Sequence, residues 1–229
     1  MGRIFRLDNL KGDPSTLKQT ILLKVALIEL GLNPDSFDIG IDHDKGVSTV
    51  NGLKFGIVYP EHFFAIAKKH YHGMQKKTQF YFNGFEGSNQ ERKRLLEPYS
   101  SREGSEIIFS NEGRDLYQKG RVNPKYFEGM STSHFGLCPH QPNWPGNLNS
   151  LWTYRFIECL MLKTAPVLLR ATPLSKQFIQ GFEFVYDDEI GPVPQNSYLS
   201  EVQLEQNFAL ACQKFTLPKH FIKTINETI

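Results

Sequence analysis

The stretch between residues 133 and 169 constrains the fold more than any other part of the chain. Residues 133–139 and 164–169 are short apolar runs that predict two buried strands. Residues 150–163 between them predict a helix, which a proline- and asparagine-rich loop at 139–149 connects to the first strand. A strand, a helix and a second buried strand in this order are typical of a parallel sheet covered by helices.

The start of this helix has the residue types of a phosphate site. Asn149 or Ser150 is the expected cap, because the side-chain oxygens of both residue types accept hydrogen bonds from free backbone N–H groups. Those N–H groups and the positive end of the helix dipole suit an anion. Arg155 follows about one turn later, and Glu158 lies on the same face three residues further on.

The chemistry of these two side chains points to a nucleotide-sugar site. A guanidinium fork fits a diphosphate, and a carboxylate fits a pair of sugar hydroxyls. The alternative is an intrahelical ion pair between Arg155 and Glu158 on the surface, worth only about 0.3–0.5 kcal/mol. The apolar residues around Arg155 favour a buried helix, in which an arginine needs a partner.

The remaining chain alternates between expected strands and helices, which predicts a mostly parallel sheet. Helical patterns run from Asp13 to Gly31, over 61–72, from 90, over 123–130, and from 200 or 201 to 214. Strand patterns cover 37–46, 52–59, 79–83, 106–110 and 182–186. A boundary near residues 73–78 divides the chain into a short N-terminal α/β lobe, 1–77, and a larger Rossmann-like lobe, 78–229.

A second half of the phosphate site is expected after the strand at 79–83. Gly84 begins a glycine-containing loop, and a basic helix with Arg92 and Arg94 follows. Backbone N–H groups together with Arg92 or Arg94 would hold the other side of a pyrophosphate. The alternative is an ordinary exposed basic helix.

Composition narrows the classes of partner. With 229 residues and a net charge of +2, the chain has no charge signature of a nucleic-acid or membrane-surface binder. Its three cysteines are widely spaced, which predicts free thiols in a reducing compartment and argues against structural zinc. No apolar signal region opens the chain and no apolar run reaches about 18 residues, so we expect a cytoplasmic protein with no transmembrane segment.

The order of features from about residue 79 to residue 169 resembles the exostosin-like glycosyltransferases of family 47. The matching residues are Tyr81-Phe-Asn-Gly84, Arg92 or Arg94, Tyr126-x-x-x-Met130-x-x-Ser133-x-Phe135-x-Leu137-x-Pro139, Tyr154-Arg155-Phe-Ile-Glu158 and Pro166-Val167. The resemblance implies a GT-B-type donor lobe, an inverting transfer from a uridine diphosphate sugar to a glycan acceptor, and no metal or other cofactor.

Two departures from the family leave a second hypothesis open. His140 and Gln141 stand where the family often has an arginine after the proline, and the segment before residue 78 is far shorter than the family's acceptor lobe. The alternative is therefore a catalytically degenerate lobe that binds a glycan or a partner protein. No P-loop lysine motif or G-x-G-x-x-G supports another kind of nucleotide-binding enzyme.

The expected catalytic base is a side chain of the acceptor lobe or of the cleft. Asp42 and His43 lie at a strand end, where ligands gather in open sheets, although Asp42–Asp44 also fits a solvated turn. Glu86 and His140 are the other candidates. Asp187–Glu189 is expected to be an exposed turn rather than a metal site. The predicted substrate-binding residues are Gly84, Arg92, Arg94, His140, Asn149, Ser150, Tyr154, Arg155 and Glu158.

Overall fold

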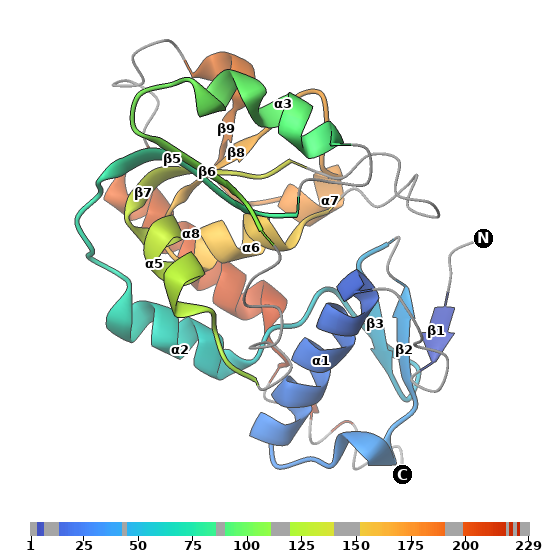
Figure 1. Ribbon diagram of the computed structural model, residues 1–229. Coiled ribbons are helices and arrows are strands. Elements are labelled where there is room, and N and C mark those ends of the chain that lie inside the picture. The colour runs from blue at the N-terminus through green and yellow to red at the C-terminus, as the bar shows by residue number, and fades with distance from the viewer. Residues whose placement is uncertain are drawn as a thin grey trace.

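The computed structural model describes residues 4–6, 14–42, 45–85, 90–110, 120–139, 152–190 and 199–218, together with 220, 221 and 224. These residues build two sheets (Figure 1). The first sheet and helix α1 form the N-terminal unit, and a larger parallel sheet with helices on both faces forms the rest.

The N-terminal unit is a four-stranded antiparallel sheet packed against one helix. Its strands lie in chain order, β1 (Ile4–Arg6), β2 (Ile39–Asp42), β3 (Val47–Val50) and β4 (Leu53–Phe55), and its helix is α1 (Pro14–Glu29). The predicted strand at 52–59 is wrong in its extent, and β3 was missed. Asn51 and Gly52 both have positive φ, 48° and 79°, so they make the tight turn of a β3–β4 hairpin.

The second sheet is wholly parallel, with the spatial order β6-β5-β7-β8-β9. It is a Rossmann-like α/β arrangement, as the alternating sequence pattern predicts. The strands are β5 (Thr78–Gly84), β6 (Ser105–Phe109), β7 (Ser133–Leu137), β8 (Ala165–Leu168) and β9 (Val185–Tyr186). The last strand is shorter than the expected 182–186.

Helices cover both faces of this sheet (Figure 1). Helix α3 (Glu91–Ser100) lies on one face, and α5 (Pro124–Ser131), α6 (Tyr154–Met161) and α8 (Glu201–Phe215) lie on the other together with α2 (Glu61–His70). The short helix α7 (Lys176–Ile179) leads towards β9. Asn123 caps α5 and Ser200 caps α8, and both side chains accept a backbone N–H.

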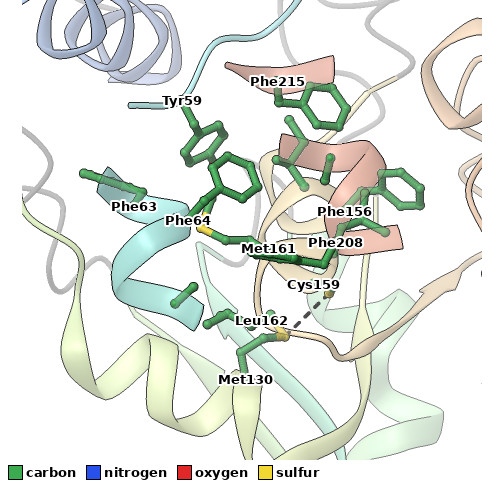
Figure 2. Packing of buried hydrophobic residues seen from close by; sticks show 14 of the residues in the cluster. Tyr59, Phe63, Phe64, Met130, Phe156, Cys159, Met161, Leu162, Phe208 and Phe215 are labelled. Carbon is green, nitrogen blue, oxygen red and sulfur yellow. Dashed lines mark hydrogen bonds between the residues drawn. The ribbon is translucent and has the colours of Figure 1, made fainter. Parts of the chain in front are cut away.

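Side chains alternate between two cores along β5. Phe80 and Phe82 pack with Leu96 and Tyr99 of α3, whereas Tyr81 joins the opposite core. Figure 2 shows that opposite core, where Phe64 of α2 meets Phe208 of α8 and lies near side chains of α6. Helix α2 therefore packs with the helices of the parallel sheet, and the division of the chain at residue 77 stays a prediction.

Candidate functional site

The parallel sheet opens between β5 and β7 at its carboxyl edge. The chain passes from β5 to β6 on one side and then to β7 on the other, so the strand order reverses between β5 and β7. The register of this pair ends at Tyr81 and Gly136, although β5 continues to Gly84. Ligands of open α/β sheets bind in the crevice outside the strand ends at such a reversal.

Arg155 of α6 reaches the carboxyl end of β5 at this reversal. Gly84 O accepts from Ser110 N on the β6 side, and because carbonyl directions alternate along a strand, Asn83 O faces the β7 side. Arg155 Nη2 donates to Asn83 O at 3.1 Å. If β7 extended further, one of its backbone N–H groups would donate to Asn83 O. The Arg155 guanidinium makes this hydrogen bond instead.

The guanidinium crosses from one face of the sheet to the other at Gly84. It starts from α6 on one face, and its Cζ lies 4.2 Å from the centroid of the Phe82 ring, which belongs to the core of the other face. A Cβ on Gly84 would lie 1.7 Å from Arg155 Nη2, so only glycine leaves the passage open. Arg155 Nε is buried without a hydrogen-bond partner among the described residues.

The structure separates the two arginines expected on the other side of the crevice. Arg92 Nη1 donates to Phe85 O at 3.2 Å, so Arg92 and Arg155 hold carbonyls two residues apart at the end of β5. Arg94 lies exposed on α3. Sequence periodicity could not distinguish Arg92 from Arg94, because which of the two faces the strand end depends on the residue at which α3 begins.

Glu158 is the centre of a buried polar cluster. Its side chain is 3% exposed and accepts from Lys18 Nζ at 2.8 Å, from Tyr59 OH at 3.0 Å and from Tyr126 OH at 2.7 Å. Burial raises the pKa of Glu158, but the Lys18 charge and the hydrogen bonds from Lys18 and Tyr126 outweigh it, so the pKa lies below its ordinary value. That Glu158 binds ribose hydroxyls stays a prediction, and Lys18, Tyr59 and Tyr126 already donate to this carboxylate.

The N-terminal unit meets α6 close to Arg155. Lys18 Nζ lies 4.2 Å from the centroid of the Tyr154 ring, and that ring meets the Trp152 ring edge-on at 4.8 Å. A Cβ on Gly46, in the turn after β2, would lie 3.0 Å from the Trp152 ring. The turn that follows the candidate base Asp42 therefore lies beside the residues that lead into α6. The Asp42 carboxylate is paired with Lys45 Nζ at 3.1 Å.

The expected start of the central helix is wrong. Trp152 and Thr153 are not helical, and α6 begins at Tyr154. Thr153 is extended and its hydroxyl accepts from Arg155 N at 3.4 Å, so this hydroxyl provides the cap. Arg155 is consequently the second residue of the helix. The predicted residues His43, Glu86, His140, Asn149 and Ser150 lie outside the described residues.

Sequence reasoning missed the three donors to Glu158. Lys18, Tyr59 and Tyr126 are ordinary members of amphipathic or strand-like patterns, and Lys18 is separated from Glu158 by 140 positions. The sequence indicated only that the helix is buried and that Arg155 in it needs a partner.

Among the described residues, no group of three or more histidine, cysteine or acidic side chains is arranged to hold a metal ion. No described helix has the length and apolar character to cross a membrane. The site consists of Arg92 and Arg155 at the end of β5, the buried Glu158 carboxylate on the same helix as Arg155, and the adjoining turn at Gly46 of the N-terminal unit.

No family model matches the chain, and no curated protein matches its sequence. The function of the site is therefore inferred from its geometry and from the resemblance of its sequence motifs.

Proposed function

We propose that this protein is an inverting glycosyltransferase that moves a sugar from a nucleoside diphosphate sugar, with uridine as the base, to a glycan hydroxyl. The observation that carries the proposal is the Arg155 guanidinium, which lies at the carboxyl end of β5, beside the reversal of strand order, and has a buried Nε without a described partner. Stabilising the charge of a departing diphosphate is the largest electrostatic task of this reaction.

The proposal gives each element a chemical task. Arg155 and Arg92 neutralise the leaving diphosphate at the end of β5 without a metal ion. The parallel sheet acts as the donor lobe of a GT-B-type enzyme, and the N-terminal unit supplies the acceptor side. One candidate base, Asp42, ends β2 just before the turn whose Gly46 lies against Trp152 and hence beside α6, and the other, His43, lies outside the described residues.

Binding of nucleoside diphosphates tests this proposal directly. We expect uridine diphosphate to bind to the wild-type protein in a calorimetric titration, and Arg155→Ala to weaken binding roughly 10- to 100-fold, because a hydrogen bond to a charged group is worth about 1.5–3 kcal/mol. Guanosine and adenosine diphosphates report the base preference.

Arg102→Ala is the matched control. Arg102 is also a half-buried arginine over aromatic rings, 5.4 Å from Phe80 and 4.9 Å from Tyr99, but it lies just before β6, at the opposite edge of the sheet. Its loss should leave binding unchanged. If no nucleoside diphosphate binds to the wild type, or if both variants bind as the wild type does, the proposal is wrong.

A second candidate function is a catalytically degenerate lobe that binds a glycan or a partner protein. The saturation of Glu158 by Lys18, Tyr59 and Tyr126 favours it, because this carboxylate would otherwise be available to a ribose. Donor hydrolysis separates the two functions. Release of uridine diphosphate from a uridine diphosphate sugar, with loss of release in Arg155→Ala, excludes the degenerate lobe.

A further inference from the structure

Lys18 contacts two residues of α6, Tyr154 and Glu158, and Arg155 lies between them in the sequence. Its Nζ lies 2.8 Å from Glu158 Oε1 and 4.2 Å from the centroid of the Tyr154 ring. The Glu158 side chain is 3% exposed and the Lys18 side chain 20%. One amine of the N-terminal unit thus neutralises a carboxylate on the helix that carries the candidate anion-binding arginine.

Arg155 is placed to compete for the same carboxylate. Residues three apart on a helix are neighbours on its surface, and the Arg155 charge acts on Glu158 in addition to that of Lys18. In the folded protein, Arg155 instead donates to the neutral carbonyl of Asn83. A hydrogen bond to a carboxylate is about twice as strong as one to a neutral acceptor, so this arrangement depends on how well Glu158 is already neutralised.

We infer that Lys18 is a positioning residue: by neutralising Glu158, it leaves the Arg155 guanidinium directed into the crevice at the end of β5, available to an anion. Without Lys18, Glu158 is a buried carboxylate that has lost its close cation, which is among the most unfavourable states in a protein interior. Arg155 then turns towards Glu158 and away from Asn83 and Gly84.

The inference deepens the proposed function and rests on it in one respect, namely that the anion is the diphosphate of the donor. It also assigns a task to the N-terminal unit beyond supplying an acceptor surface. Docking of α1 on α6 brings Lys18 to Glu158, so the N-terminal unit completes the electrostatics of a site built on the other sheet.

A charge-balanced pair of substitutions tests this role. Titrations with uridine diphosphate and with inorganic pyrophosphate should show binding weakened about tenfold or more in Lys18→Met, because the guanidinium is diverted. The double variant K18M/E158Q should recover most of the affinity that Lys18→Met loses, since a neutral glutamine no longer attracts Arg155.

Two single variants complete the set. Lys24→Met removes another lysine of α1, one whose 3.3 Å ion pair with Asp35 is exposed, and should leave binding unchanged. Glu158→Gln should bind as K18M/E158Q does, because Lys18 acts on Arg155 only through this carboxylate. Wild-type affinity in Lys18→Met, or a double variant as weak as Lys18→Met, overturns the inference.

A ligand-free measurement separates this inference from the proposed function. Double-mutant cycles between Arg155 and Glu158, measured by urea unfolding, should show a larger coupling in the K18M background than in the wild type. Should the wild type bind neither anion, the proposed function fails, and this cycle alone decides the inference. A coupling that does not grow on removal of Lys18 refutes it.

Discussion

Two arginines at the carboxyl edge of the parallel sheet, Arg155 and Arg170, lie in opposite electrostatic surroundings. Arg155 lies at the end of β5, half-buried, with a neutral carbonyl as its acceptor and an aromatic ring beneath it. Arg170 follows β8 and also lies over an aromatic ring, that of Tyr186 at 3.5 Å. Residue type and stacking are therefore the same in the two regions.

The two regions differ in what surrounds the positive charge. Arg170 Nε donates to both carboxylate oxygens of Asp188 at 3.0 Å, and its Nη2 donates to Glu189 at 3.3 Å. Acidic residues thus neutralise Arg170, whereas Glu158, a carboxylate on which the Arg155 charge acts, is held by Lys18 and two tyrosines. An arginine at a strand end is open to an anionic ligand only where the protein has not already neutralised it.

The largest effect expected from this comparison is on stability, at Glu158. Glu158→Ala removes the acceptor of three buried donors and should lower the free energy of unfolding by about 3–5 kcal/mol. Urea unfolding followed by circular dichroism measures it. Asp188→Ala removes a carboxylate from the exposed Arg170 cluster and should leave the midpoint unchanged, and equal losses in the two variants would erase the difference between the regions.

Gly84→Ala tests the passage that Arg155 uses. The new methyl group would overlap Arg155 Nη2, which ends a flexible side chain and can move aside, so we expect little loss of stability but weaker binding of uridine diphosphate. Gly56→Ala is the control, because a Cβ there meets no atom within 4 Å. Unchanged binding in Gly84→Ala would mean that the guanidinium does not need this path.

Acid sensitivity should depend on Glu158. Because its folded-state pKa lies below the ordinary value of about 4.3, the ionised carboxylate stabilises the fold above that pH, and this contribution disappears as pH falls through the lower folded-state pKa. The stability difference between wild type and Glu158→Gln should be constant from pH 7 to about pH 5 and shrink below it. Urea midpoints across this range measure the difference, and one that stays constant down to pH 3 contradicts the assignment.

The smallest effect should come from Arg170. Its side chain is 52% exposed and its ion pairs are screened by solvent, so Arg170→Ala should change neither the unfolding midpoint nor the affinity for uridine diphosphate beyond experimental scatter. A loss of affinity comparable with that of Arg155→Ala would place the anion site at the β8 and β9 ends instead.

Local patterns in the sequence were enough to predict much of the parallel sheet and its helices. The Asn123-Pro124 start of α5 and the Ser200 cap of α8 involve contacts within a few residues, so their signals are local. The start of α6 was misplaced, because Thr153 competes with two equally good cap residues only a few positions earlier. The Asn51-Gly52 hairpin was a local signal that the strand prediction over 52–59 overlooked.

By itself the sequence determined the alternation of strands and helices, the pairing of an arginine and a glutamate on one helix, and a glycine at the end of a strand. These follow from periodicity and capping, which act over one or two turns of chain. Only the tertiary structure decided that Arg155 passes Gly84 into the β5–β7 crevice while Glu158 turns to Lys18. Burial makes an unpaired charge costly, and which partner meets that charge depends on elements brought together from distant parts of the chain.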